Sequence, residues 1–260
     1  MNKFTRARMG LAVWTRALTV VLVAVAVGPG CSEDNTTAPE PCTHCVTSMA
    51  PSHDVTIYED PLGETSNSAG AGLFAGRTTV GKIYLHPPLV RRALIRFDLV
   101  DAGIPGGSVI DSVFLALTVT RTSALTGRVP FAVHRVLADW GEGFSRPLDE
   151  GGAGTSASDG DATWIHSFYP VKFWAEVGGD FDDSASASAT ADFLDEKVTW
   201  GPTAEMTADV QGWLDDPGTN FGWIVIGDES VAGTTKRFGS RENLMVHSRP
   251  SLKVFYTVPD

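Results

Sequence analysis

Short runs in which apolar and polar side chains alternate are the feature that most constrains how this chain can fold. In Arg91–Leu99, Ala93 and Ile95 fall on one side of an extended chain. Leu94 and Arg96 fall on the other side. A period of two is typical of β-strands with one buried face. Similar short β-type runs occur at Asp54–Tyr58, Val80–Leu85, Val109–Thr120, Val129–Leu137, Lys197–Trp200, Phe221–Ile226, Arg237–Ser240 and Ser251–Val258.

Helical periodicity is nearly absent from the chain. The one candidate helix is Met206–Leu214, where Val210 and Trp213 lie on one face and Thr207 is the expected N-cap. Two long polar segments are expected to form loops, at 149–161 and 178–191. Many strands joined by such loops are typical of sandwiches and jelly rolls. The predicted fold class is all-β, an antiparallel β-sandwich or jelly roll with one short helix.

The first thirty residues have the pattern of an export signal. Four basic residues accompany an apolar run of 11 residues, Ala17–Val27. A membrane span needs roughly 20 apolar residues, so this run is too short to cross a bilayer. A basic leader, a short apolar core and small residues before a cleavage site are typical of a secretory signal peptide. We therefore predict a signal peptide at residues 1–30.

Cys31 follows this leader directly. Bacterial lipoproteins are cut before a cysteine that then carries the lipid, and VGPGCS resembles that cleavage signal, with the small Gly30 in front of Cys31. Lipidation at Cys31 would hold the protein on a membrane surface without a transmembrane helix. The expected product is an outer-membrane or cell-surface lipoprotein. Ordinary cleavage, which releases a secreted protein, is the alternative.

Residues 31–52 are expected to form a flexible linker, and residues 53–260 the folded domain. The linker is rich in Ser, Thr, Pro and Asn, and such a composition buries too little apolar surface to fold. Cys42 and Cys45 form a single CxxC pair within it. One pair without further Cys or His ligands is a weak zinc signal, so a local disulfide is expected in an oxidising compartment.

Negative charge argues against several classes of partner. The whole chain has a net charge of −11, and residues 31–260 carry 16 basic and 31 acidic residues, a net charge of about −15. Nucleic-acid binding depends on Lys and Arg that neutralise phosphates, so it is not expected. Docking on anionic lipid headgroups is not expected either. Contact with a membrane is expected only through the lipid anchor.

Several segments occur in a recognisable order, RRALIRFDL, IPGGSVIDSVFLALTV, VHRVLADWGEG, ATW, VQGWLDDPGTNFGWIV and RPSLKVFY. Together they resemble the DNRLRE-domain proteins, also grouped with an alginate-associated family of carbohydrate-binding modules. The resemblance covers roughly residues 54–257. It implies an extracellular β-sandwich module, often attached to polysaccharide-degrading enzymes or surface proteins. With no catalytic domain expected here, the resemblance implies a binding or display role.

Tryptophan side chains are candidates for stacking on sugar rings. Trp174 lies in SFYPVKFWAEVGGD, between the two polar segments, and is the expected exposed aromatic residue. With Tyr169 and Phe173 it would form an aromatic platform for a sugar. The other tryptophans are expected mainly to fill the core, where each buries a large apolar area, among them Trp140, Trp164, Trp213 and Trp223.

Basic residues on or beside the predicted strands are the second set of candidates. An acidic polysaccharide such as alginate needs Arg or Lys to contact its carboxylates, and Arg can make two parallel hydrogen bonds to one carboxylate. Because the chain is acidic, such a surface has to be local. Scattered surface ion pairs are the alternative, for example Arg96 with Glu242. The predicted ligand-binding residues are Arg92, Arg96, Arg237 and Arg241, and Lys82, Arg91 and Lys236 lie near them in the sequence.

Aspartates of the polar segment 178–191 supply oxygen ligands of the kind that calcium prefers. Asp180, Asp182 and Asp183 are the predicted metal ligands, for a structural calcium ion. Their spacing does not match the EF-hand loop. Solvated acidic loops are the alternative.

Catalytic motifs such as GxSxG, HExxH and the phosphate loop do not occur in the sequence. No catalytic residue is therefore predicted. The leading hypothesis is an exported, surface-tethered, non-catalytic carbohydrate-binding module for an extracellular polysaccharide. A structural or adhesion module of the cell envelope that binds protein partners is the second hypothesis. A polysaccharide-cleaving enzyme is the third.

Overall fold

The computed structural model describes residues 42–79, 89–122 and 127–259. The predictions for the signal peptide, for Cys31 and for the strand Val80–Leu85 lie outside these residues. Within the described ranges, no helix is both long and apolar enough to span a bilayer.

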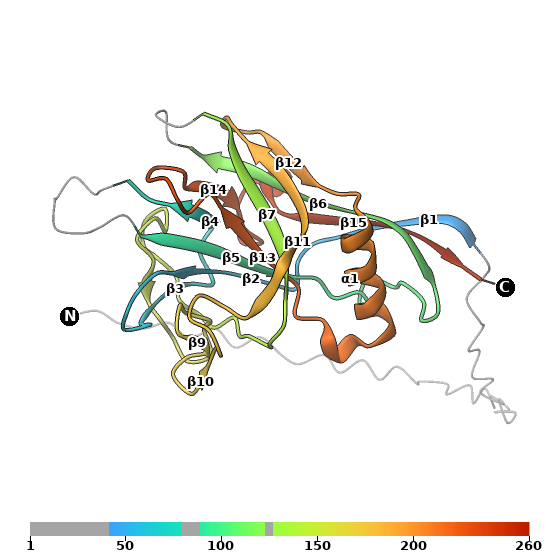
Figure 1. Ribbon diagram of the computed structural model, residues 1–260, viewed down its shortest axis with the longest axis horizontal. Coiled ribbons are helices and arrows are strands. Elements are labelled where there is room, and N and C mark those ends of the chain that lie inside the picture. The colour runs from blue at the N-terminus through green and yellow to red at the C-terminus, as the bar shows by residue number, and fades with distance from the viewer. Residues whose placement is uncertain (1–41, 80–88, 123–126, 260) are drawn as a thin grey trace, which may run out of the picture. The chain divides into compact units, whose positions relative to one another are not determined.

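Antiparallel ladders join the strands into two layers, connected at one side (Figure 1). The first sheet has the order β11 (Phe181–Ala191), β7 (Val129–Val136), β13 (Trp223–Gly227), β5 (Val90–Arg96), β2 (His53–Tyr58), β3 (Thr65–Asn67), β8 (Thr155–Ser156). The second sheet has the order β1 (Cys42–Met49), β15 (Ser251–Val258), β6 (Val109–Arg121), β12 (Lys197–Trp200). Two strands connect the sheets, β4 (Gly72–Arg77) and β14 (Lys236–Gly239). The predicted all-β sandwich is confirmed.

The main core lies between the two sheets. The alternation predicted for β5 is observed, because Ala93 and Ile95 face this core while Leu94 faces the opposite side of the sheet. In β6, Leu115 and Leu117 face the same core. Three large aromatic side chains from the second half of the chain complete it, Trp200, Trp213 and Trp223.

A second core covers the outer face of the first sheet. Leu94 and Ile224 on this face pack in one cluster with Trp140 and Trp174. The two tryptophans belong to residues 137–180, which connect β7 to β11 and include the short strands β9 (His166–Phe168) and β10 (Lys172–Phe173). This connection therefore gives the sandwich a third layer on one side.

The helix α1 (Ala204–Asp215) lies beside β6 and β11 (Figure 1). Val210 and Trp213 are buried, as predicted. The N-cap is Thr203 and not Thr207, because Thr203 Oγ1 accepts a hydrogen bond from the Met206 backbone N–H at 3.1 Å. The helix therefore begins two residues earlier than predicted. A short 3₁₀ turn, η1 (Pro217–Thr219), follows it, and another, η2 (Val246–Ser248), precedes β15.

Two segments predicted to lack regular structure are strands. Residues 42–49, predicted as part of the flexible linker, form β1, which pairs with β15 and turns Cys45 and Met49 toward the main core. The predicted loop 178–191 contains β11, whose Ala187 and Ala191 are buried in the same core. Ser and Ala have low β-propensity, so a sequence rich in them does not predict a strand. They can still form one where a neighbouring strand provides the hydrogen-bond ladder and the core leaves room only for small side chains. The predicted disulfide between Cys42 and Cys45 is present.

Candidate functional site

The predicted aromatic platform is wrong in its central residue. Trp174 is only 6% exposed, and its Nε1 donates a hydrogen bond to the Thr163 carbonyl at 2.9 Å. Phe173 is 62% exposed and Tyr169 is partly exposed, and both rings pack against His166. Trp174 therefore holds the connection 137–180 on the sheet instead of presenting a ring to a ligand.

Arg92 and Arg96 stabilise the second core. Arg92 makes two hydrogen bonds to the Glu229 carboxylate, at 2.8 and 2.9 Å, and lies 4.9 Å above the Trp164 ring. Arg96 bonds Asp139 at 2.8 Å, so it forms an ion pair as the alternative expected, but its partner is Asp139 and not Glu242. Because their charges are already paired within the protein, these two arginines are poor candidates for ligand binding.

The three predicted calcium ligands do not form one site. Asp180 accepts hydrogen bonds from two backbone N–H groups of its own loop, and Asp182 pairs with Arg135 at 3.3 Å. Asp182 and Asp183 are consecutive residues of β11, and neither belongs to a converging acidic group among the described residues. Among the described residues, the acidic side chains that do converge are Asp54, Glu142 and Glu242.

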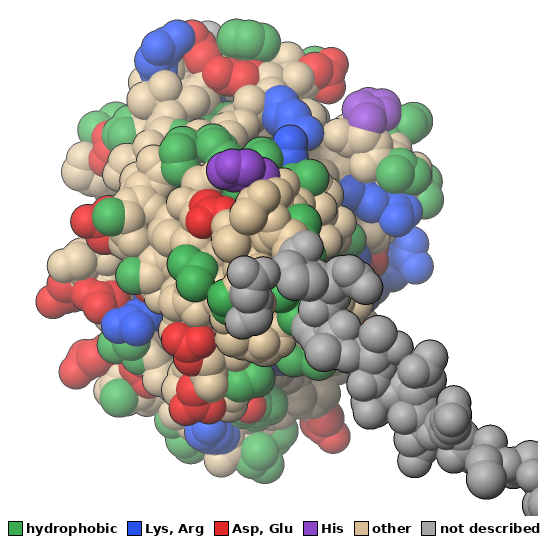
Figure 2. Space-filling view, turned by 90° about the vertical axis from the view of Figure 1, so that its right-hand side faces the viewer, with side chains coloured by type: hydrophobic (Ala, Val, Ile, Leu, Met, Phe, Trp, Pro, Cys, Tyr) green, Lys and Arg blue, Asp and Glu red, His purple; other side chains and the backbone are tan. Residues whose placement is uncertain are grey.

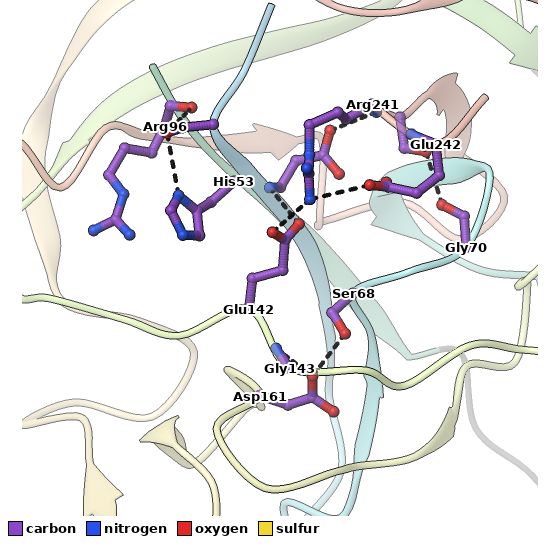
Figure 3. Close-up of polar contacts among 12 residues, drawn as sticks. His53, Ser68, Gly70, Arg96, Glu142, Gly143, Asp161, Arg241 and Glu242 are labelled. Atoms are coloured by element: carbon purple, nitrogen blue, oxygen red, sulfur yellow. Dashed lines mark hydrogen bonds and ion pairs between the residues drawn. The ribbon is translucent and has the colours of Figure 1, made fainter. Parts of the chain in front are cut away.

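Arg241 contacts all three carboxylates of this acidic cluster (Figure 3). Arg241 Nη2 lies 2.6 Å from Glu142 Oε2 and 3.1 Å from Glu242 Oε1, and its backbone N–H donates to Asp54 Oδ2 at 2.7 Å. Burial, followed by the nearby charge of Glu242, raises the pKa of Asp54 well above its ordinary value of 3.8. Arg241 was a predicted ligand-binding residue. In the structure its contacts with Asp54 and Glu142 instead hold residues 240–243 against β2.

The raised pKa of Asp54 predicts a pH-dependent stability that an Asp54→Asn variant lacks. A carboxyl with a higher pKa in the folded state binds its proton more tightly there, so folding is favoured as the pH falls through that pKa toward 3.8. Urea unfolding of both proteins from about pH 8 to about pH 5 measures the difference. We expect wild type to gain stability relative to the variant on acidification. Parallel curves for the two proteins would contradict this assignment.

A different pocket, of about 440 Å³, collects positive charge without a matching number of carboxylates. It lies where β4, β5, β14 and the end of β6 meet. The strand register brings its residues together, because Arg237 pairs with Phe74 on one side and with Arg121 on the other, while Arg91 pairs with Gly76. The lining includes three arginines, Arg91, Arg121 and Arg237. We call this site the arginine pocket.

Arg91 is the unusual member of the arginine pocket. Its side chain is mostly buried and lies 5.3 Å above the Tyr58 ring, and its Nε is buried without a hydrogen-bond partner. No ion pair joins Arg91 to a carboxylate anywhere in the described ranges. Desolvation lowers the pKa of Arg91 from its ordinary value. A buried cation without a counter-charge costs folding free energy, and an anionic ligand would remove that cost.

The neighbours of Arg91 leave the pocket positive. Arg237 donates to the Glu150 carbonyl at 3.2 Å and to Thr120 Oγ1 at 2.9 Å, so it is held by neutral acceptors. The exposed Arg121 forms an ion pair with the Glu150 carboxylate. Thr235 Oγ1, also in the lining, is buried and has no hydrogen-bond partner. Among the described residues, the three guanidinium groups thus form only one ion pair, between Arg121 and Glu150.

Sequence reasoning found part of this site. Arg237 was a predicted ligand-binding residue, and Arg91 was among the basic residues near the predicted set. Arg121 and Thr235 were missed. Arg121 follows the alternating run of β6, and a register shift between Arg237 and Phe238 places it beside Arg237. No pattern in the sequence reveals such a shift.

No family model and no curated protein matches this chain. The resemblance to DNRLRE-domain proteins therefore stays a prediction based on the order of the sequence segments.

Proposed function

We propose that this protein is a non-catalytic carbohydrate-binding module that binds an acidic extracellular polysaccharide through the arginine pocket. The observation that carries the proposal is the mostly buried guanidinium of Arg91, which forms no ion pair with any described residue and lines the same pocket as Arg237. Export and a lipid anchor at Cys31, as predicted from the sequence, belong to the same proposal. They would place the module outside the cytoplasm, where such polymers occur.

The chemistry of the arginine pocket favours a carboxylate on a sugar ring. A guanidinium group binds a carboxylate with two parallel hydrogen bonds, and such charge-assisted bonds are strong where water is partly excluded. Thr78 and Thr235 add hydroxyl groups to the lining, and the buried Phe74 ring lies 6.0 Å from the Arg237 guanidinium. This mixture suits an acidic sugar that carries both a carboxylate and hydroxyl groups.

Negative charge on the rest of the surface disfavours the binding of other polyanions. The chain has a net charge of −11, and acidic side chains are spread over much of the face in Figure 2. A long, densely charged polymer such as nucleic acid would be repelled outside the pocket. A polysaccharide with one carboxylate per sugar carries less charge along its length and would meet less repulsion.

Protein binding is the alternative function. Three consecutive apolar side chains before β15 are exposed, Leu244, Met245 and Val246. Exposed apolar groups of this kind occur at protein-binding surfaces. If the folded wild-type protein binds none of the acidic polysaccharides in the experiment below, this alternative is favoured.

Arg91→Gln is expected to weaken binding of the preferred acidic polysaccharide roughly 10- to 100-fold, because a hydrogen bond to a charged group contributes about 1.5–3 kcal/mol. Affinity electrophoresis in gels that contain alginate, pectate or hyaluronate measures this loss, with neutral mannan as the reference polymer. The Arg237→Gln variant is expected to show the same selective loss.

Two controls separate binding from folding and from net charge. Lys172→Gln removes the same charge from an exposed residue of β10 and is expected to bind like wild type. Arg91→Gln is expected to unfold at a temperature no lower than wild type, since the variant lacks an uncompensated buried cation. If folded wild-type protein binds none of the acidic polymers, or if Arg91→Gln binds them equally well, the proposal is wrong.

A further inference from the structure

The outer face of the second sheet carries a shallow groove of about 390 Å³. Phe114 of β6 and Phe255 of β15 lie in it, with ring centroids 6.0 Å apart and ring planes at 76°. Lys253 pairs with Phe114 in the β6–β15 ladder, and Lys197 extends from the neighbouring β12. The groove thus combines partly exposed aromatic rings with two exposed lysines.

Charge distinguishes this groove from most of the protein surface. Its lining contains both lysines and no carboxylate. Across the described ranges, neither Lys197 nor Lys253 forms an ion pair, although acidic residues outnumber basic ones in the chain. The ammonium group of Lys253 instead lies 4.9 Å above the Phe255 ring. Charge complementarity therefore points to an anionic ligand that also has an apolar surface.

The groove and the arginine pocket lie along the same face of β6. Arg237 Nη1 donates to Thr120 Oγ1, and Lys197 pairs with Thr118, two residues earlier on β6. Two residues of a strand span about 7 Å, and alternate side chains share a face. From Thr120 to Phe114 the same face extends about 20 Å. The turn η2 covers the middle of this face, because Thr118 is buried and its Oγ1 donates to the His247 carbonyl at 3.5 Å, so a ligand that reaches both sites has to pass over η2.

We propose that the acidic polysaccharide continues from the arginine pocket across the turn η2 into this groove. Lys197 and Lys253 contact further carboxylates of the same polymer, and the rings of Phe114 and Phe255 contact the apolar faces of its sugars. This inference rests on the proposed function and adds to it that the ligand is a chain of several acidic sugars. A single acidic sugar fills only the arginine pocket.

The test compares short and long ligands, using the acidic polymer of the panel that wild type binds most tightly. Affinities for its disaccharide and for its long chains are measured by titration calorimetry. The Lys197→Gln/Lys253→Gln double variant is expected to bind long chains five- to tenfold more weakly and the disaccharide as tightly as wild type. Arg91→Gln is expected to weaken both. A Lys172→Gln/Arg146→Gln double variant, which loses the same charge from exposed positions elsewhere, is expected to match wild type.

The outcomes distinguish the two proposals. Long-chain affinity that is unchanged in the groove variant, while Arg91→Gln still loses binding, would overturn the groove and leave the proposed function intact. Wild type that binds no acidic polymer would overturn both. Lysine-dependent binding to phosphatidylglycerol vesicles, with long-chain affinity unchanged in the groove variant, would assign this face to an anionic lipid surface instead.

Discussion

Trp140→Ala is expected to lower the free energy of unfolding by about 3–5 kcal/mol, the largest single effect that we predict. Trp140 is 1% exposed and packs with Leu94 and Ile224 in the second core. The Arg96 guanidinium lies 5.2 Å from its ring, and its Nε1 donates to the Phe221 carbonyl at 2.8 Å. Alanine would leave a large cavity and an unpaired carbonyl where residues 137–180 meet the first sheet.

Urea unfolding at neutral pH measures this loss. Trp140→Phe is the matched control, because it keeps an aromatic ring in the cavity but removes the indole N–H. We expect this control to lose less stability than the alanine variant. A loss of less than about 1 kcal/mol in Trp140→Ala would show that the connection is not packed on the sheet as described.

Asp209→Ala is expected to lower the free energy of unfolding by about 2–4 kcal/mol. The carboxylate of Asp209 accepts hydrogen bonds from Ser186 Oγ at 2.6 Å and from Trp223 Nε1 at 2.8 Å. It thereby joins α1 to β11 and β13, and the Trp223 ring in turn packs on Trp213 of the helix. Alanine leaves two buried donors without an acceptor.

The Asp209→Asn variant removes the negative charge but keeps a side-chain oxygen that can accept a hydrogen bond. Its side-chain oxygen can still accept from Trp223, so the asparagine variant is expected to lose about half as much stability as the alanine variant. Equal losses would show that the negative charge, which lies 3.6 Å from the Arg135 Nε, is the stabilising feature. Near-wild-type stability in both variants would contradict the described anchoring of α1.

The main core could be predicted from the sequence, because alternation alone assigns Ala93 and Ile95 to one face and Leu94 to the other. The second core could not be predicted. Trp174 lies in a segment without periodicity. Nothing in its neighbourhood in the sequence indicates that its ring packs on the outer face of the first sheet and that its Nε1 bonds the Thr163 carbonyl. Alternation therefore predicts which strand positions are buried, but it does not predict which distant segment covers them.

The candidate site shows the same limit for charged residues. Alternation places Arg92 and Arg96 on one face of β5, yet it gives no information on the acids that meet them. Glu229 and Asp139 come from distant parts of the chain and neutralise both arginines. Arg91 forms no ion pair with any carboxylate in the part of the chain that the structure describes. What separates a candidate binding residue from a structural one is thus a long-range pairing that the sequence alone does not show.

The position of β1 also determines how far the described end of the chain at Cys42 lies from the arginine pocket. Cys42 pairs with Val258, so the described chain enters and leaves the sandwich at the same end (Figure 1). At this end β6 begins, with Val109 opposite Thr257, and it reaches Arg121 about 40 Å away. Cys42 and Val258 therefore lie at the opposite end of β6 from Arg121 and the arginine pocket. A second protein joined to the end of β15 would therefore begin about 40 Å from the arginine pocket.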